Sequence, residues 1–209
     1  MKPPGTYLIH RKDHVSLNEL RYSTLLDQGS FIASADAVEW SESDERSKVF
    51  GIYSEDGVLL SSMRAEHITK PEHLTPKLDY EFLDRLISFP CGLLGKASTR
   101  AGFEGRGFNT YLRYLAYEDF HRMGIQYVVG TLMPEASRMK LLKCLGYTFI
   151  ENPDGWRRYG YNSFGPTLVA YLDLKKNYDR VMSVLETKIR KNRELYPFRE
   201  STCESEQVL

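Results

Sequence analysis

The stretch FEGRGFNTYL, Phe103–Leu112, lies between an apolar run and a segment with helical periodicity. Its two glycines, Gly105 and Gly107, allow backbone conformations in which neighbouring N–H groups turn toward one point. The helix expected from Phe108 adds the positive end of its dipole, and Arg106 adds a positive charge. The turn is therefore suited to hold a phosphate group. The alternative interpretation is a glycine-rich connector that only joins a strand to a helix.

The segments around this turn alternate between strand and helix patterns. A strand is expected before the turn, at Leu93–Thr99. After the turn, one helical stripe is followed by Gly124, which suits a helix end; its members are Phe108, Leu112, Leu115, Ala116, Phe120 and Met123. The later elements expected are a β-branched strand at 126–132, a helix from Pro134 to Gly146, strands at 147–150 and 167–174, and an amphipathic helix at 178–189.

The amino-terminal part predicts a hairpin with helices on either side of it. The apolar runs KVFGIY and VLLSSMRAE are separated by SEDG, and Asp-Gly between such runs is a strong hairpin signal. Before the hairpin we expect a strand at 6–10, a helix at 14–27 and a polar loop with a short helix at 29–47. After it, Thr75 and Pro76 are suited to start a helix that runs to Phe89.

Length and composition are those of an ordinary globular protein. The 209 residues are 42% hydrophobic and 27% charged, and we expect one domain over residues 1–193 with a flexible tail at 194–209. Lys plus Arg and Asp plus Glu both number 28, so overall charge does not favour a nucleic-acid partner. No apolar run is long enough to span a membrane, and the first residues have no apolar signal region.

The three cysteines, Cys91, Cys144 and Cys203, are far apart and lack the paired spacing of a metal site. An odd number of isolated cysteines suits the reducing cytoplasm. The histidines form no His-Glu-x-x-His pair. The sequence therefore predicts a cytoplasmic protein without a metal ion.

The order of elements from residue 46 to 151 resembles the core of the GNAT acyltransferase superfamily. In that family, an RGxGxG turn after the fourth strand binds the pyrophosphate of acyl-CoA or the phosphate of an acyl carrier protein's pantetheine arm. A helix ending in LGF follows the fifth strand, and Leu145-Gly146-Tyr147 has that place here. The resemblance implies an α+β fold: a central mixed, mostly antiparallel sheet, helices on both faces, and a splayed strand pair.

Four positions differ from the family pattern. Glu104 replaces an arginine of the turn, and Asn109 replaces a glycine or alanine. Leu142 replaces the tyrosine that often protonates the leaving thiolate, and Glu135 replaces an asparagine earlier in the same helix. These differences speak against ordinary acetyl transfer from acetyl-CoA.

The amino-terminal third resembles the GNAT branch of long-chain N-acyl amino acid synthases and acyl-homoserine-lactone synthases. The matching elements are Leu20-Arg21-Tyr22 in an early helix, Asp44 in an acidic loop, Phe50 and Tyr53 in the first hairpin strand, and Ser62-x-Arg64 at the end of the second. The tryptophan and paired aspartates of lactone synthases are matched only by Trp40 and Asp44. The match therefore favours the N-acyl amino acid synthases.

The resemblance also implies site residues. The acyl donor's phosphate would be bound by Phe103, Gly105, Arg106, Gly107, Phe108, Asn109 and Thr110. Backbone N–H groups near Ser98 and Thr99 would polarise the thioester carbonyl. Arg21 or Arg64 would bind the acceptor's carboxylate beside Asp44, with surface or salt-bridged arginines as the alternative. The base would be Glu66, Glu135 or a water held by either one, although each is also a reasonable surface residue.

These features predict an N-acyltransferase that joins a long-chain acyl group, carried by acyl carrier protein or CoA, to the amino group of an amino acid. No tightly bound cofactor is expected, because the acyl-phosphopantetheine donor is a substrate. The basic carboxyl-terminal helix would bind the acidic carrier protein, or it is a solvated charged face. The alternatives are an acyl-homoserine-lactone synthase, an acetyl-CoA-dependent N-acetyltransferase and a non-catalytic sensor of acyl ligands.

Overall fold

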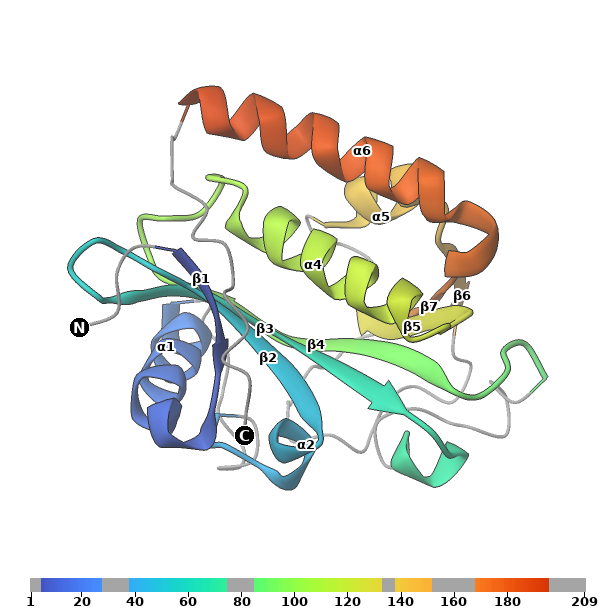
Figure 1. Cartoon of the computed structure of the whole chain (residues 1–209), viewed down its shortest axis with the longest axis horizontal. Helices are drawn as coiled ribbons and strands as arrows, with labels where there is room; N and C mark the ends of the chain where they lie inside the picture. The colour runs from blue at the N-terminus through green and yellow to red at the C-terminus, as the bar shows by residue number, and fades with distance from the viewer. Residues whose placement is uncertain (1–4, 28–37, 75–84, 133–137, 152–167, 196–209) are drawn as a thin grey trace.

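The computed structural model describes residues 5–27, 38–74, 85–132, 138–151 and 168–195. Its seven strands form one mixed sheet in the order β1-β2-β3-β4-β5-β7-β6 (Figure 1). The strands are β1 (Gly5–Ile9), β2 (Ser47–Tyr53), β3 (Leu59–Ile68), β4 (Cys91–Thr99), β5 (Tyr127–Leu132), β6 (Thr148–Glu151) and β7 (Leu168–Asp173). Only β4 and β5 pair in parallel, so the predicted mixed, mostly antiparallel sheet is confirmed.

Helices cover both faces of this sheet (Figure 1). One face carries α1 (His14–Asp27) and the four-residue α2 (Glu42–Glu45), and we call it the α1 face. The other carries α4 (Phe108–Arg122), α5 (Met139–Leu145) and α6 (Leu174–Leu195), and we call it the α4 face. The predicted helices on both faces are therefore confirmed.

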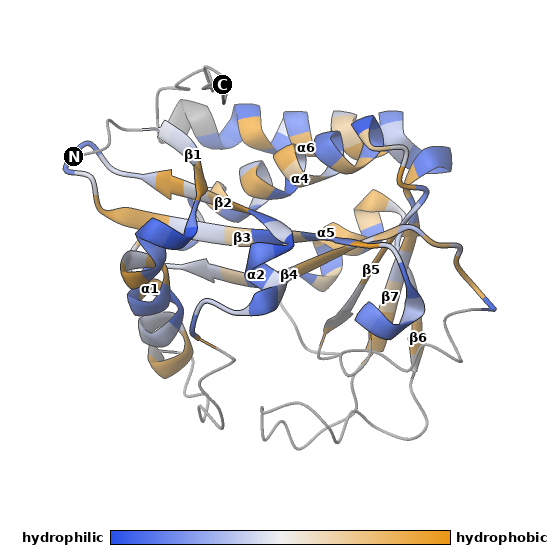
Figure 2. Ribbon diagram, turned by 60° about the horizontal axis from the view of Figure 1, so that its bottom comes forward, coloured by the Kyte–Doolittle hydropathy of each residue, from blue (hydrophilic) through white to orange (hydrophobic). Residues whose placement is uncertain are grey.

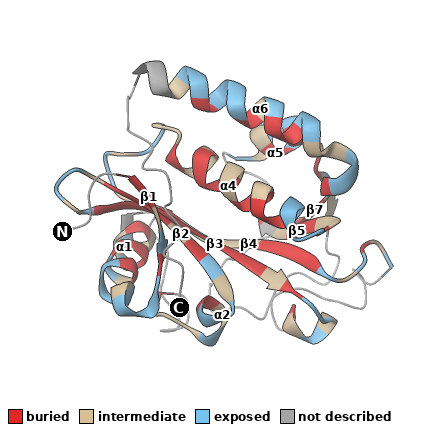
Figure 3. Ribbon diagram, viewed as in Figure 1, coloured by how far each residue is buried: buried red, intermediate tan, exposed pale blue. Residues whose placement is uncertain are grey.

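The largest apolar core lies between the sheet and the helices of the α4 face. Its fully buried members include Leu112, Phe120, Val128, Leu172 and Leu185. Burial of each such side chain stabilises the fold by about 1.5–3 kcal/mol. Figure 3 shows that the buried residues of α4 and α6 lie on their inward sides. The 3.6-residue period seen in the sequence is what gives each helix this single buried side.

Helix α6 crosses α4 in the opposite direction. The ring of Tyr178, near the start of α6, stacks on His121 at the end of α4 with centroids 3.6 Å apart. At the other end, Asn192 lies against Gly107, which precedes α4. The outward side of α6 is hydrophilic in Figure 2. No helix in the described part of the chain has the length and apolar character needed to cross a membrane.

Strands β4 and β5 pair over three residues only. The partners are Cys91 and Tyr127, Gly92 and Val128, and Leu93 and Val129. Beyond Leu93, β4 continues to Thr99 beside β3, whereas β5 continues to Leu132 beside β7. The predicted splayed pair is confirmed, and edges of both strands remain open where their pairing ends.

Several predicted boundaries were wrong. A helix was expected at 75–89, but residues 85–90 form turns and bends. Leu86 and Phe89 are nevertheless partly buried against an apolar core. Residues 75–84 lie outside the described part. Arg64 is inside β3, not at a strand end, because pairing with β4 continues to Ile68. Met123 is 43% exposed because it is the C-cap of α4. The tail from 196 lies outside the described residues.

Two strand glycines provide a test of how tightly α4 packs on the sheet. A Cβ on Gly92 would lie 2.6 Å from the Phe120 ring, whereas one on Gly130 would meet nothing within 4 Å. We expect Gly92→Ala to lower the free energy of unfolding by about 1–3 kcal/mol, because the close-packed core must shift to make room for the methyl group. Gly130→Ala should be neutral or slightly stabilising. Urea unfolding measures both, and equal losses would contradict this packing.

Candidate functional site

The turn before α4 brings the first backbone N–H groups of a helix together. The first helical hydrogen bond runs from Tyr111 N–H to Gly107 O at 3.0 Å, so the N–H groups of Phe108, Asn109 and Thr110 have no partner inside the helix. They lie at the positive end of a 15-residue helix. This geometry suits an anion, as the sequence predicted.

The side chains of the turn form a small aromatic platform. The rings of Phe103 and Phe108 stack with centroids 6.5 Å apart, and the Arg106 guanidinium lies 4.5 Å from the centre of the Phe103 ring. Glu104 points to solvent as an exposed residue. The Arg106 guanidinium therefore lies over the Phe103 ring, within the same turn as the start of α4.

The two glycines of the turn differ in their surroundings. Gly105 and Gly107 both have positive φ, +74° and +85°. A Cβ on Gly107 would lie 2.1 Å from Asn192 Nδ2, whereas a Cβ on Gly105 would meet nothing within 4 Å. Gly107 is therefore required by the packing of α6 as well as by its backbone angles. Gly105 faces open space.

A second open space lies on β5, on the α4 face. Val128 and Leu132 both belong to the core under α4, so Gly130 between them faces the same way by strand alternation. Nothing lies within 4 Å of a Cβ placed on Gly130. Since Gly130 follows the last residue paired with β4, this open space adjoins the gap between the two strands.

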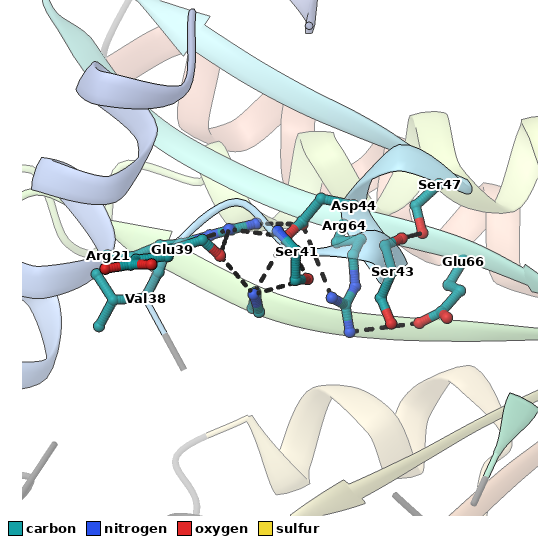
Figure 4. A network of polar contacts seen from close by, with 10 residues as sticks. Arg21, Val38, Glu39, Ser41, Ser43, Asp44, Ser47, Arg64 and Glu66 are labelled. Atoms are coloured by element: carbon teal, nitrogen blue, oxygen red, sulfur yellow. Dashed lines mark hydrogen bonds and ion pairs between the residues drawn. The ribbon is translucent and has the colours of Figure 1, made fainter. Parts of the chain in front are cut away.

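The α1 face carries a buried ionic network centred on Asp44 of α2 (Figure 4). We call Arg21, Asp44, Arg64, Glu66 and Lys96 the Asp44 network. Arg21, on α1, donates to both carboxylate oxygens, with Nη2–Oδ1 at 2.7 Å and Nη1–Oδ2 at 3.2 Å. Lys96, on β4, approaches Oδ2 at 3.1 Å. The network therefore ties two helices to the sheet at this point.

The remaining pair of the network lies on β3. Arg64 Nη1 is 3.7 Å from Asp44 Oδ1, and Arg64 Nη2 is 3.3 Å from Glu66 Oε2. Both side chains are almost completely buried. Because a buried charge is costly unless it is paired, these contacts keep the two residues in fixed positions.

Local sequence explains why Asp44 is the centre. Ser41 caps α2, and Asp44 accepts hydrogen bonds from the backbone N–H and hydroxyl of Ser41 at 3.0 and 2.8 Å. Burial alone would raise the pKa of the Asp44 carboxyl. The hydrogen bonds from Arg21 and the charges of Arg21, Lys96 and Arg64 nevertheless hold this pKa well below its ordinary value of 3.8. Asp44 is therefore ionised at neutral pH.

The end of β4 places Ser98 and Thr99 opposite β3. Ser61 donates to Ser98 O at 2.9 Å and lies 3.0 Å from the Thr99 hydroxyl. Arg100 N–H donates to Leu60 O on β3. Because peptide groups alternate along a strand, the N–H of Thr99 faces away from β3, toward the open edge.

The fold thus arranges the predicted residues in two groups. The turn Phe103–Thr110 lies at the start of α4, whereas Arg21, Asp44, Arg64 and Glu66 lie together on the α1 face. The open part of β4 lies between them. Glu135 lies outside the described residues.

Comparison with known proteins identified the fold. No family model and no curated protein sequence matches this chain. Among solved structures, FeeM, an N-acyl amino acid synthase from uncultured soil microbes, aligns over 86% of this chain and 96% of its own, with TM-score 0.63 and 12% identity. This chain has the GNAT acyltransferase fold.

Other GNAT structures align over similar lengths. The CoA-dependent acyl-homoserine lactone synthase BjaI aligns over 86% of this chain and 83% of its own, with TM-score 0.58 and 14% identity. A Bacillus subtilis acetyltransferase solved with CoA covers 82% of this chain and 99% of its own, with TM-score 0.56 and 16% identity. At such identities the likeness establishes the fold, and the site must supply the argument for function.

Sequence reasoning missed Lys96. Its ammonium contacts Asp44, Glu39 O at 3.1 Å and Ser41 Oγ at 3.4 Å. Burial, followed by the charge of Arg21, lowers its pKa to about 8, although Asp44 opposes that shift. The available signal was a lysine in the otherwise apolar or small run LLGKAST of a central strand.

A buried polar cluster on the GNAT core was also missed. Arg113 Nη1 donates to Tyr117 Oη at 3.1 Å, and that oxygen lies 2.6 Å from Tyr147 Oη. Tyr147 stands where the GNAT pattern has the phenylalanine of LGF. Burial, followed by Tyr117, raises the phenol's pKa, so Tyr147 is a poor replacement for the proton donor absent at Leu142. The cluster instead links α4 to the start of β6.

The lowered pKa of Asp44 predicts a specific acid sensitivity. A carboxyl whose pKa is lower in the folded state adds stability above its unfolded pKa, near 3.8, and that stability is lost as pH falls below it. We expect this loss to be on the order of 2 kcal/mol between pH 5 and pH 2. Asp44→Asn should be less stable at pH 7, because the buried Arg21 loses its counter-ion, and should have a flatter pH dependence.

Urea unfolding at a series of pH values measures this effect. Glu42→Gln is the matched control, because Glu42 is an exposed acid of the same helix and is 84% exposed in its ion pair with Arg46. Identical pH profiles for wild type and Asp44→Asn would show that Asp44 does not carry the acid sensitivity.

Proposed function

We propose that this protein is an N-acyltransferase that transfers a long-chain acyl group from a phosphopantetheine thioester to the amino group of an amino acid. One observation carries the proposal. The gap between β4 and β5 separates the glycine-containing turn before α4, on the α4 face, from the Asp44 network on the α1 face. A donor with a phosphate and an acceptor with a carboxylate would meet in that gap from opposite sides.

The donor's phosphate would lie on the N–H groups of Phe108, Asn109 and Thr110, beside Arg106. The pantetheine arm would then run toward the gap past Gly130, where the α4 face of β5 is open. Placing two reactants in one gap can remove about 7–11 kcal/mol of the barrier. Positioning is therefore the main contribution we assign to the fold.

The reaction is direct attack by the amine on the thioester. The nitrogen lone pair forms a bond to the carbonyl carbon, the C–S bond then breaks, and the proton that the nitrogen loses passes through the base to the thiolate, which leaves as a thiol. The N–H of Thr99, which faces the open edge of β4, is the donor that we place on the carbonyl oxygen. Ser98 N–H faces β3 by the same alternation and is less suited to this role.

No acyl-cysteine intermediate is needed. Cys91 is fully buried, and burial raises the pKa of its thiol to about 12, with Glu66 adding to the effect. At neutral pH this sulfur is therefore a thiol and a poor nucleophile. Cys144 is exposed on α5, away from β4, and Cys203 lies outside the described residues.

The acceptor side has the charge that an amino acid requires. Arg21, Arg64 and Lys96 surround Asp44 where β4 has left β5. Arg21 is 2% exposed and donates to Asp44, so we assign it to bracing that carboxylate. Glu66 is paired with Arg64, and its proposed role as base requires that pair to open; Glu135 or a held water is the other candidate.

Helix α6 supports acyl carrier protein as the donor's carrier. Its exposed basic residues are Lys175, Lys176, Arg180, Lys188, Arg190 and Lys191. Lys191 precedes Asn192, which lies against Gly107 in the turn before α4. An acidic carrier bound along this end of α6 would bring its phosphopantetheine to the turn. Arg180 also donates to Cys144 O, so it has a structural contact as well.

Mass spectrometry of lipid extracts from cells that overproduce the protein tests this function. We expect a new N-acylated amino acid, whose fragments identify both substrates, and we expect it to be absent from cells that produce the Thr99→Pro variant, which lacks the proposed N–H donor. Circular dichroism of that variant establishes whether it is folded. A new acyl-homoserine lactone or acetylated amine would instead support an alternative acyltransferase, and no acylated product would support a sensor.

The donor turn has its own matched pair of variants. Gly105 and Gly102 both have positive φ and open space where a Cβ would lie, but only Gly105 lies between the phosphate-turn residues. Both substitutions to alanine should cost about 1 kcal/mol of stability through backbone strain. Gly105→Ala should also weaken binding of CoA or acyl carrier protein on the order of tenfold, whereas Gly102→Ala should not.

Isothermal titration calorimetry of both variants separates these effects. Equal affinity in wild type and Gly105→Ala would exclude the proposed phosphate contact. Substitution of Gly107 would be less informative, because its collision with Asn192 would disturb α6 whether or not a phosphate binds there.

A further inference from the structure

Lys96 lies at a strained point of the open part of β4. Its φ is +46°, and no other non-glycine residue of the described chain has a positive φ. The pairing shows why: Ser62 and Arg64 of β3 lie opposite Ser98 and Gly95, so β4 contains one extra residue in this interval. Such a bulge redirects a side chain and is frequent at functional sites. Here it directs the lysine side chain onto the α1 face.

The lysine is the most accessible cation of the Asp44 network. Its side chain is 11% exposed, compared with 2% for Arg21 and 6% for Arg64. The terminal nitrogens of Arg21 are used by Asp44 and by the carbonyls of Val38 and Glu39. Those of Arg64 lie against Asp44 and Glu66. An incoming ligand would therefore reach Lys96 first.

The network has more positive than negative charge. Its members are three cations, Arg21, Arg64 and Lys96, and two carboxylates, Asp44 and Glu66. The other described ions of α2 are paired at the surface, Glu42 with Arg46 and Glu45 with Arg11. Glu39 contributes its backbone carbonyl to Lys96. One anionic group bound at Lys96 would balance the charge of this mostly buried cluster.

We propose that Lys96 is the residue that binds the carboxylate of the acceptor, with Arg21, Asp44 and Arg64 as positioning residues that hold its ammonium. The inference rests on the proposed function and defines its acceptor class: amino acids with a free carboxylate. Amino acid amides carry the same amine without the anion and would be poor acceptors.

Competitive amine labelling tests the contact without requiring turnover. The full-length protein is treated with a limiting amount of acetic anhydride, and peptide mass spectrometry measures labelling of Lys96 and of Lys188, an exposed control on α6. A mixture of the twenty amino acids should slow labelling of Lys96 about tenfold at ten times the dissociation constant. The corresponding mixture of amino acid amides should not protect it. Because the free amines of both mixtures also consume the reagent, labelling of Lys96 is expressed relative to labelling of Lys188 in the same sample.

The labelling result also separates this inference from the proposed reaction. Equal protection by amides and amino acids, or no protection in a protein whose cells form an acylated amino acid, would overturn the role of Lys96 and leave the reaction standing. Protection by amino acids alone, in a protein that forms no acylated product, would support the carboxylate site and remove the reaction.

Variants give a second measurement. Lys96→Met retains most of the length of the side chain and removes its charge, and we expect the acceptor KM to rise on the order of tenfold, the effect of losing a charged hydrogen bond. Donor affinity should not change, and Lys96→Arg should recover part of the loss. Lys140→Met is the control, because Lys140 is an exposed lysine of α5 that has no proposed role. A Lys96→Met protein that is folded, as judged by its melting temperature, with an unchanged acceptor KM would overturn the proposal.

Discussion

The pairing of β4 with β5 ends at Leu93, and the candidate site depends on that ending. Parallel strands need a long crossover, and α4 provides it, with its start near the end of β4. Had pairing continued to Thr99, β5 would occupy this edge of β4 and would leave no gap beside Gly130. The bulge at Lys96 lies in the same part of β4, because the extra residue comes after the pairing with β5 has ended, where the strand partner of β4 is β3.

The two faces of the sheet present different polar groups beside this gap. On the α4 face, the start of a helix supplies neutral dipoles of the kind that suit an anion without a buried charge. On the α1 face, five ionised side chains are held together around Asp44, and their burial is tolerable because each has a partner of opposite charge. The first arrangement suits a large phosphate ligand near solvent. The second suits a small ligand that must be oriented.

The tight packing of α6 connects the donor turn to the rest of the core. Asn192 fills the space beside Gly107, and Tyr178 stacks on His121 at the opposite end of α4. Helix α4 is therefore fixed at both ends, which keeps the N–H groups of its first turn in one orientation. Preorganised donors of this kind need no reordering when a ligand binds.

Local patterns in the sequence determined most of the elements. The hairpin at Asp56-Gly57, the helix after Gly107 and the αL residue Gly146 follow from rules that act over a few neighbours. The resemblance supplied the mixed sheet and the splayed strand pair. The turn at Phe103–Thr110 was also predictable, because its glycines and the following helix are contiguous in sequence. The non-helical structure of residues 85–89 was not predictable, because the helical periodicity of the sequence continues through a segment that leads into β4.

Only the tertiary structure decided the composition of the Asp44 network. The resemblance placed Arg21, Arg64 and Asp44 together at the acceptor site, but it did not include Lys96, which is distant from Arg21 and Asp44 in sequence. Their meeting depends on the packing of α1 and α2 on β3 and β4, and on one bulge that no local pattern announces. Arg113 is a second example. Its position on α4 gives no local sign of burial, and its polar cluster forms only because the turn that carries Tyr147 packs against this helix. Long-range packing decides which charges are buried together, and local sequence periodicity does not predict those contacts.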